Sequence, residues 1–376
     1  MPDVAFVQSL SCIAHKNHKL RDPSCHEVAF TLSGAAETFI QTAIYDIVSG
    51  WYTTKSVNGT DTIAGYYCEP TIKNENSTKL QLMFHSITAN RDYWSAMGGT
   101  TLGYESYKPE IYSWRHYANG LGYPTLQLDR LGHGKSSHPD PAVYTQGPYE
   151  ASLYVDLAKQ IRSGSTGQIP QYDELLYISN SYGSVLGVYI AQTYPDLFNI
   201  SVFTGYTKRI LPSYYGIALQ NPQSAAMLFP ERFPSTVPAL YLTSPNELTR
   251  TNSFFGVHDQ VDFEQELAQI WWEREDVVAA GEYIGTYVLM TKAPAYTRRI
   301  LVITGEQDQP FCGQGTPTIA VAACGDLLPE TAEIFPNAEF NWKRIAKTGH
   351  AINLCLSAQE TFKTAHDFLA GSRFNG

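Results

Sequence analysis

The chain has 376 residues, of which 36 are acidic and 26 basic, so its formal net charge is −10. Charged residues make up only 16% of the sequence. An acidic chain without a basic run binds nucleic acid poorly, because neutralising phosphate needs clustered Lys and Arg. Hydrophobic residues reach 43%, which excludes disorder, yet no apolar stretch approaches the roughly 20 residues that span a bilayer. We therefore expect a compact globular protein with no nucleic-acid partner and no membrane span.

The first predicted elements are two strands, at 27–33 and 62–68, which are expected to pair antiparallel. After them, apolar runs of strand length alternate with longer helical patterns, which indicates a mostly parallel sheet covered by helices on both faces. The further strands are expected at 80–84, 125–128, 174–178, 200–203, 300–303 and 340–345. The helices are expected at 104–122, 149–162, 183–198, 262–275 and 357–369.

The alternation stops between residues 209 and 295. This segment holds Pro-rich turns and helical runs but no clear strand. The simplest organisation is one α/β core interrupted by a helical insertion at 209–295. The core would then comprise 1–208, including an N-terminal extension over 1–25, together with 296–376.

An even number of cysteines, some of them close in sequence, is typical of disulfides and hence of a secretory route. No Cys or His cluster has the spacing of a zinc site, so no metal is expected. The short-range pairs would be Cys12 with Cys25 and Cys312 with Cys324. The remaining two, Cys68 and Cys355, would pair only if the early strand at 62–68 lay near the loop after His350. The alternative is free thiols in a cytosolic enzyme. The six cysteines are Cys12, Cys25, Cys68, Cys312, Cys324 and Cys355.

Three Asn-X-Ser/Thr triplets, at Asn58, Asn76 and Asn199, are candidate glycosylation sites. A glycan is less expected at Asn199, because this residue opens a predicted strand. Residues 1–10 have neither a basic start nor an apolar run of signal-peptide length. A secreted form would therefore have lost its signal peptide.

The sharpest local pattern lies at 178–183, where a predicted strand runs through a tight turn into a helix. Ser181 is flanked by the small residues Ser179, two positions before it, and Gly183, two positions after it. Such a turn crowds the backbone and pushes one side chain outward. This is the nucleophile-elbow pattern G-x-S-x-G, with Ser179 in the first Gly position. Ser181 is therefore the predicted nucleophile, and the alternative is a serine that only caps the helix.

A serine hydroxyl is a weak nucleophile and needs a neighbouring base. His350 lies in the loop between the last predicted strand and helix, from where it can reach the carboxyl edge of the sheet. Asp308 follows the strand at 300–303 and is the predicted carboxylate that orients the base, with Glu306 as the runner-up. The chain order Ser181, Asp308, His350 is the order that the elbow pattern requires.

Acyl transfer also needs donors for an oxyanion. One donor would be the backbone N–H of Tyr182, at the start of the helix after the elbow. The second should come from the loop after the strand at 80–84, at 85–90. The alternative for this loop is a polar connection without a catalytic role.

These motifs together resemble the α/β-hydrolase superfamily over residues 25–208 and 296–372. Two further marks are His85-Ser86, where the family usually has His-Gly, and the sequence DRLGHGKS at 129–136, which is similar to the family's D-x-x-G-x-G-x-S loop. The sequence looks most similar to secreted fungal serine hydrolases with a helical lid. The resemblance implies an α/β-hydrolase fold, with a mostly parallel central sheet flanked by helices.

For the site, the resemblance implies a Ser181–His350–Asp308 triad, with the amides of Ile87 and Tyr182 as the oxyanion hole. It implies a serine hydrolase without a cofactor. The enzyme would cleave a carboxylic ester or lactone of an apolar or aromatic small molecule through an acyl-enzyme. A serine peptidase and a non-hydrolytic binding protein or cyclase remain alternatives. Further candidates for the substrate pocket are His85, Ser86, Trp94, Tyr214, Tyr215 and Trp271.

Overall fold

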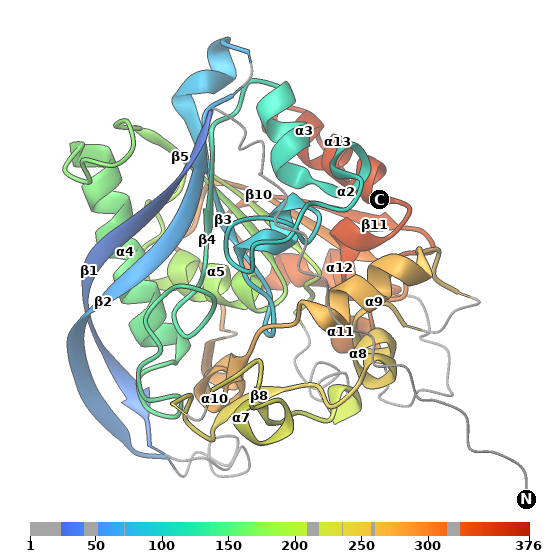
Figure 1. Ribbon diagram of the computed structural model, residues 1–376. Helices are drawn as coiled ribbons and strands as arrows, with labels where there is room; N and C mark the ends of the chain where they lie inside the picture. The colour runs from blue at the N-terminus through green and yellow to red at the C-terminus, as the bar shows by residue number, and fades with distance from the viewer. Residues whose placement is uncertain are drawn as a thin grey trace, which may run out of the picture.

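The computed structural model describes residues 24–40, 52–70, 72–208, 218–234, 236–256, 260–289, 291–313 and 324–376. Eight strands form one sheet in the order β1-β2-β4-β3-β5-β6-β10-β11 (Figure 1). The pairs β1–β2 and β2–β4 are antiparallel, and the other neighbours are parallel. The strands are β1 (Cys25–Phe39), β2 (Thr54–Cys68), β3 (Lys79–Phe84), β4 (Thr125–Leu128), β5 (Glu174–Asn180), β6 (Ile200–Thr204), β10 (Arg299–Gly305) and β11 (Glu339–Ile345).

Helices cover both faces of this sheet, which confirms the predicted architecture. In β3, Leu82 and Phe84 join the core beneath α4 and α5, whereas Met83 joins the opposite core beneath α3 and α13. Val302 and Leu301 of β10 alternate between the two cores in the same way. Parallel strands buried on both faces need continuous apolar runs, which is why the sequence shows them. The four helices are α3 (Trp114–Gly120), α4 (Gly147–Ser163), α5 (Tyr182–Thr193) and α13 (Ala358–Leu369).

The single helix expected at 104–122 is wrong, because the structure has two short helices there. These are α2 (Pro109–Tyr112) and α3, separated by Ser113 in an extended conformation. The Ser113 hydroxyl accepts a hydrogen bond from the amide of His116 at 3.1 Å and so caps α3. A serine in this cap position favours a new helix start over a continuous helix.

The insertion is not purely helical, which corrects the expectation of no strand in this segment. Its described residues form a small antiparallel sheet in the order β7-β8-β9, with strands of two or three residues. Strands this short carry no readable alternation. The elements are β7 (Gln223–Ser224), α7 (Ala225–Leu228), β8 (Tyr241–Thr243), α8 (Glu247–Phe254), α9 (Gln265–Glu273), β9 (Val278–Ala279) and α10 (Ala280–Leu289).

The two described disulfides differ in part from the expected pairing. Cys312 pairs with Cys324 as expected. Cys25 pairs with Cys68 instead of Cys12, because the β1–β2 register places these two residues opposite each other, with Cα atoms 4.1 Å apart. Cys355 is a buried free thiol, so its expected disulfide is wrong. Cys12 lies outside the described residues.

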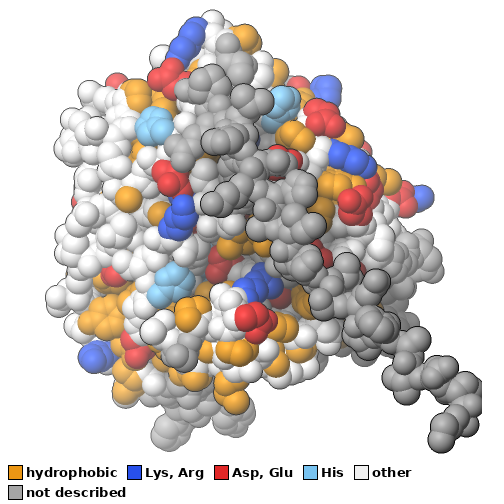
Figure 2. Space-filling view, viewed as in Figure 1, with side chains coloured by type: hydrophobic (Ala, Val, Ile, Leu, Met, Phe, Trp, Pro, Cys, Tyr) orange, Lys and Arg blue, Asp and Glu red, His pale blue; other side chains and the backbone are white. Residues whose placement is uncertain are grey.

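On the face of the molecule drawn in Figure 2, the described charged side chains are scattered, as the low charge content of the sequence suggested. Much of the described surface is white, which marks uncharged polar side chains and backbone, and hydrophobic side chains are spread over the lower part of the view, where α7 and β8 lie in Figure 1. Within the described ranges, no helix has both the length and the apolar character needed to cross a membrane.

The three candidate glycosylation sites differ in how free the asparagine side chain is. Asn58 lies exposed on β2. The Asn76 amide donates to the carbonyl of Leu121 at 3.1 Å, and the Asn199 side chain accepts from the amide of Leu175 at 3.0 Å. A glycan is therefore compatible with the described contacts at Asn58 more readily than at the other two.

Candidate active site

Ser181 stands at a strained turn between β5 and α5. Its backbone has φ 57° and ψ −118°, a combination that a non-glycine residue adopts only when its surroundings enforce it. The Ser181 amide donates to the carbonyl of Thr204 at 2.9 Å. A Cβ on Gly183 would lie 2.4 Å from the carbonyl oxygen of Phe84, so α5 can pack this closely on β3 only with glycine there.

Ser179, which replaces the first glycine of the elbow pattern, is fully buried below this turn. Its hydroxyl lies 3.0 Å from the hydroxyl of Ser184 and donates to the carbonyl of Val202. A buried hydroxyl costs stability unless it has such partners. These bonds explain how a serine fits where the pattern prefers glycine.

His350 and Asp308 form a fully buried pair at the carboxyl edge of the sheet. His350 Nδ1 lies 2.8 Å from Asp308 Oδ2. The other carboxylate oxygen accepts from the amide of Phe311 at 2.9 Å, because Asp308 caps the short helix α11 (Gln309–Cys312). A carboxylate is an acceptor only, so Nδ1 carries the proton and Nε2 presents its lone pair. His350 Nε2 has no hydrogen-bond partner among the residues that the structure describes.

The runner-up acid, Glu306, does not reach the imidazole. Its carboxylate lies 3.9 Å from the guanidinium of Arg344 and accepts from the amide of Lys347, on the outer side of the same loop. Of the two acids in this loop, only Asp308 contacts His350.

Two phenylalanine rings hold the imidazole of His350. Phe311 stacks on it with ring centroids 5.6 Å apart and an interplanar angle of 22°. Phe254, from α8 of the insertion, lies at the same distance and is tilted by 42°. Gly205, with φ 59°, passes close to the ring, and a Cβ there would lie 3.1 Å from it. The insertion therefore contributes directly to the surroundings of this histidine.

Ser181 and His350 open onto one cavity with a largely apolar lining. Its volume is about 30 Å³, which is room for one or two water molecules. Ile87 and Tyr182 line it as well, and within the described residues no group accepts a hydrogen bond from either backbone amide. The other lining residues are Val185, Ser253, Phe254, Tyr283, Pro310 and Phe311.

Of the residues predicted for the substrate pocket, the four that the structure describes do not line this cavity. Trp94 packs edge-on against Trp114 in the core, and Trp271 packs against Phe254. Tyr214 and Tyr215 lie outside the described residues. His85 and Ser86 are fully buried behind the cavity wall.

Sequence reasoning missed Phe311 and Tyr283 as lining residues. Phe311 follows Asp308 by three residues, and the helical turn of α11 brings it back toward the acid. This spacing was visible in the sequence. Tyr283 gave no comparable signal, because it lies in an insertion whose path the sequence does not reveal.

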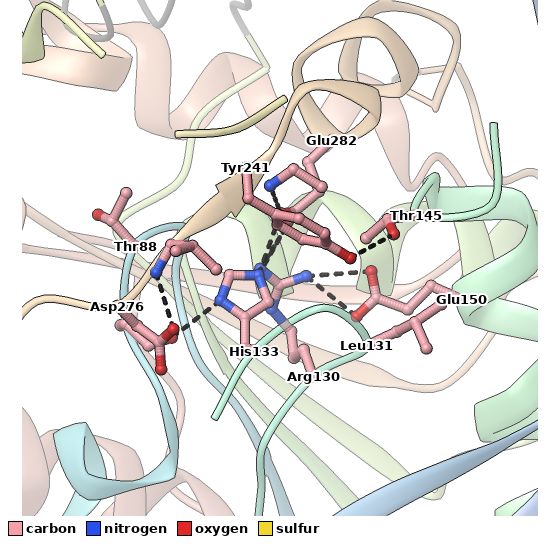
Figure 3. A network of polar contacts seen from close by, with 12 residues as sticks. Thr88, Arg130, Leu131, His133, Thr145, Glu150, Tyr241, Asp276 and Glu282 are labelled. Carbon is pink, nitrogen blue, oxygen red and sulfur yellow. Dashed lines mark hydrogen bonds and ion pairs between the residues drawn. The ribbon is translucent and has the colours of Figure 1, made fainter. Parts of the chain in front are cut away.

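The 85–90 loop, which contains Ile87, rests on a buried cluster of charged side chains. Arg130 donates to the carboxylate of Glu150 at 3.0 Å and pairs with Glu282 of α10 (Figure 3). His133 Nε2 lies 3.0 Å from Glu282. Burial alone would lower the pKa of Arg130, but the two carboxylates raise it above its ordinary value. The cluster thus holds a permanent cation directly behind the loop.

His85 is neutral in this cluster. Burial, together with electrostatic interaction with Arg130 and His133, holds the pKa of His85 well below its ordinary value. Its Nε2 accepts from the backbone amide of Arg130 at 2.9 Å, so its Nδ1 carries the proton and donates to the carbonyl of Ser86 at 2.7 Å.

The 129–136 segment has a structural role next to this cluster. The Asp129 carboxylate accepts from the amides of Arg91 at 2.9 Å and Lys135 at 3.0 Å. Burial raises the pKa of Asp129 to about 6. Gly134 has φ 52°, and a Cβ there would lie 2.3 Å from the Asp129 carboxylate carbon. The Asp and Gly of this segment therefore build a turn, and Asp129 does not line the cavity.

Comparisons with known proteins bear on the fold. No protein-family model matches the sequence, and no curated protein matches it. The structure is similar to that of an α/β-hydrolase fold protein from Chitinophaga pinensis, with a TM-score of 0.51 and 12% identity over 90% of this chain and 98% of that one. An epoxide hydrolase from Vigna radiata gives a TM-score of 0.50 and 13% identity over 83% and 95%. With its eight-stranded, mostly parallel sheet between two layers of helices, the chain has the α/β-hydrolase fold.

Proposed function

We propose that this protein is a serine hydrolase that cleaves a carboxylic ester or lactone of an apolar or aromatic small molecule through an acyl-enzyme on Ser181. The observation that carries the proposal is the buried His350–Asp308 pair, whose unpartnered Nε2 lies at the cavity onto which Ser181 opens. A serine on a strained strand-to-helix turn, a histidine and an orienting carboxylate together perform acyl transfer.

The proposed reaction begins when His350 Nε2 takes the proton of the Ser181 hydroxyl, whose oxygen attacks the carbonyl carbon. Asp308 keeps the proton on Nδ1 and stabilises the imidazolium that forms. The developing oxyanion accepts hydrogen bonds from the amides of Ile87 and Tyr182, each worth about 3 kcal/mol of barrier. His350 then returns the proton to the leaving alkoxide. Water, activated by the same nitrogen, attacks the acyl-enzyme and releases the acid.

The lining of the cavity supports an uncharged substrate. Apart from Ser181, Ser253, Tyr182, Tyr283 and His350, its described walls are aliphatic or aromatic, and no carboxylate is among the described lining residues. A peptidase that binds a substrate ammonium needs an acidic subsite, and the lining residues do not offer one. This favours an ester or lactone over a peptide.

The insertion at 209–295 is proposed to act as a lid. Ser253, Phe254 and Tyr283 of this segment close the cavity over Ser181. Because a cavity of about 30 Å³ is too small for an ester of useful size, the substrate must displace part of this cover. The disulfides Cys25–Cys68 and Cys312–Cys324 support a secreted protein, since such bonds persist in oxidising compartments.

The test is labelling by a fluorophosphonate, combined with turnover of p-nitrophenyl esters of increasing chain length. The variants are Ser181→Ala and, as a matched control, Ser179→Ala, which removes a buried hydroxyl two residues away. Wild type and Ser179→Ala should be labelled and should hydrolyse esters, whereas Ser181→Ala should do neither. Full turnover by Ser181→Ala would contradict the proposal. Labelling without turnover of any ester would favour a peptidase or a non-hydrolytic protein.

A further inference from the structure

The carbonyl groups of the 85–90 loop face the buried charges behind it. The carbonyl of Ser86 accepts from His85 Nδ1 at 2.7 Å and from Arg130 Nη2 at 3.5 Å. In a trans peptide, the C=O and the following N–H point in opposite directions. The Ile87 N–H therefore points away from Arg130, and Ile87 itself lines the cavity. Contacts to the loop carbonyls thus set the direction of the proposed oxyanion donor.

Thr88, which follows Ile87, has a backbone conformation that its side chain disfavours. Its φ is 51°, and a β-branched residue in the left-handed region is a genuine outlier. Such a conformation persists only when neighbouring groups over-determine it. Whatever holds Thr88 therefore also fixes the peptide plane that joins Ile87 to Thr88, and through it the position of Ile87.

All the described hydrogen bonds to the Thr88 hydroxyl and carbonyl come from the insertion. Arg250 of α8 donates to the Thr88 hydroxyl at 2.8 Å through Nη1 and to the Thr88 carbonyl at 2.9 Å through Nη2. Gln220 donates to the same hydroxyl at 3.0 Å, and the Asp276 amide donates to the same carbonyl at 3.0 Å. Arg250 donates hydrogen bonds to both the backbone and the side chain of Thr88, which no other residue does within the described chain.

Arg250 is itself rigidly held. It is fully buried, its Nη1 lies 2.6 Å from the carboxylate of Glu275, and its Nε donates to the carbonyl of Trp271 at 3.1 Å. The guanidinium lies 4.1 Å above the Trp271 ring and 4.8 Å above the Phe254 ring. Burial lowers the pKa of Arg250 to about 10, so it remains a cation at neutral pH. An arginine fixed in this way can impose a geometry on Thr88.

We infer that Arg250 is a positioning residue: it holds Thr88 in its left-handed conformation and so aims the Ile87 amide at the oxyanion. The insertion then completes the oxyanion hole as well as covering it. Without the guanidinium, Thr88 relaxes to a negative φ and the peptide plane between Ile87 and Thr88 rotates, which displaces Ile87 and its amide. The inference rests on the proposed function, because it assigns a role in the same reaction.

The test compares Arg250→Met with Arg299→Met. Arg299 is a matched control remote from Ser181, since it also donates to two carbonyls, those of Phe368 at 3.0 Å and Ser372 at 2.9 Å. It also stacks on an aromatic ring and pairs with a carboxylate. Each variant is assayed for kcat and KM on a p-nitrophenyl ester, for the rate of fluorophosphonate labelling and for melting temperature. Both should melt at a lower temperature than wild type.

Arg250→Met should lower kcat and the labelling rate in parallel, by about ten- to hundredfold, with KM changed less than about twofold. Arg299→Met should leave both rates unchanged. If Arg250→Met does not fold, Arg250→Lys serves instead. It keeps the charge but lacks the planar fork whose two nitrogens reach the Thr88 hydroxyl and carbonyl, so kcat should still fall.

The outcomes separate this inference from the proposed function. Unchanged kcat and labelling in a folded Arg250 variant would overturn the positioning role while leaving the hydrolase proposal intact. An equal fall in Arg299→Met would also overturn it, because the loss would then follow stability alone. Wild type that neither reacts with the fluorophosphonate nor hydrolyses esters would contradict the proposed function itself, and this inference with it.

Discussion

The amide of Ala351, the residue after His350, donates a 2.8 Å hydrogen bond to the carbonyl of Phe254 at the end of α8. The insertion and the histidine loop are therefore one packed unit at this point. The amide of Asp262 also donates to the carbonyl of Lys347 at 2.9 Å. Lifting α8 to admit a substrate would break these bonds and release the ring of Phe254 from His350. An opening that preserves the site must spare this end of α8.

The contact between α8 and the histidine loop predicts the effect of Gly349→Ala. A Cβ on Gly349 would lie 2.3 Å from the carbonyl oxygen of Phe255, so the loop or the helix must shift. We expect a stability loss of about 1–3 kcal/mol in denaturant unfolding and a fall in ester kcat of at least about tenfold. The control is Gly120→Ala at the end of α3, where the added Cβ would meet no atom within 4 Å beyond its chain neighbours and the backbone of its own helix.

Gly120→Ala should leave kcat unchanged and should stabilise the protein by as much as about 1 kcal/mol, because alanine favours a helix over glycine. The contradictory result would be a Gly349→Ala variant with wild-type kcat, since the histidine loop would then tolerate displacement from α8.

The contrast between Asp308 and Glu306 gives a second prediction. Asp308→Asn keeps the shape and the acceptor for the Phe311 amide but offers a neutral amide to His350 Nδ1. We expect kcat to fall by about 10⁴-fold with little change in melting temperature, because the imidazole loses its tautomer and its counter-charge. Glu306→Gln should retain kcat within about twofold. If the Glu306 variant lost activity and the Asp308 variant did not, the acid would have been wrongly assigned.

The core of the fold was readable because parallel strands buried on both faces must be apolar throughout. The pattern around Ser181 was readable because the turn needs small residues, and Gly183 is the clearest example. Asp308 and His350 could be predicted as site residues because each follows closely after a predicted strand. These signals are local, so one sequence is enough to show them.

What could not be predicted depends on pairing over long distances. The Cys25–Cys68 bond follows from the register of a hairpin whose strands are 15 residues each, and the sequence showed only half of each strand. The contact of Arg250 with Thr88 joins residues 162 positions apart. The sequence near Arg250 or Thr88 gives no sign of this contact. A positive φ at Thr88 could not be expected either, because threonine disfavours it.

We expect removal of each of the two disulfides to affect activity differently. Cys312–Cys324 closes the segment directly after Asp308, whereas Cys25–Cys68 joins the β1–β2 hairpin at the sheet edge. Replacing both cysteines of either pair with alanine should cost about 3–4 kcal/mol of unfolding free energy by the loop-entropy estimate. Only the loss of Cys312–Cys324 should also lower kcat, because Asp308 caps the helix that ends at Cys312.

The measurement is ester turnover of each double variant under conditions where circular dichroism shows that it is folded. Equal kcat values in the two double variants would mean that the disulfide after Asp308 does not help to hold the carboxylate against His350.

The buried position of His366 leads us to expect a specific change of stability with pH. His366 is buried against α3. Its Nε2 lies 3.1 Å from the side-chain amide nitrogen of Gln81, and its Nδ1 lies 2.7 Å from the carbonyl oxygen of Phe362. With Nδ1 donating to the carbonyl, Nε2 accepts from Gln81 and has no room for a second proton. Burial lowers the pKa of His366 from 6.5 to about 4.

The unfolded chain therefore takes up a proton at His366 below about pH 6.5, while the folded chain does so only near pH 4. The contribution of His366 to the free energy of unfolding is fully present above pH 6.5. It falls by as much as about 3 kcal/mol as the pH drops to 4. Asp129 acts in the opposite direction over part of this range, because its pKa is raised by burial. The prediction is therefore a difference between His366→Gln and wild type.

His366→Gln keeps an acceptor for the Gln81 amide but cannot titrate. The variant should be less stable than wild type at pH 7.5. The difference in the free energy of unfolding between the two proteins should narrow steadily as the pH falls toward 4.5. Urea unfolding at several pH values measures it directly, with the Asp129 contribution common to both proteins. A gap that is independent of pH would show that His366 protonates equally in the folded and unfolded chains, contrary to its buried hydrogen bonds.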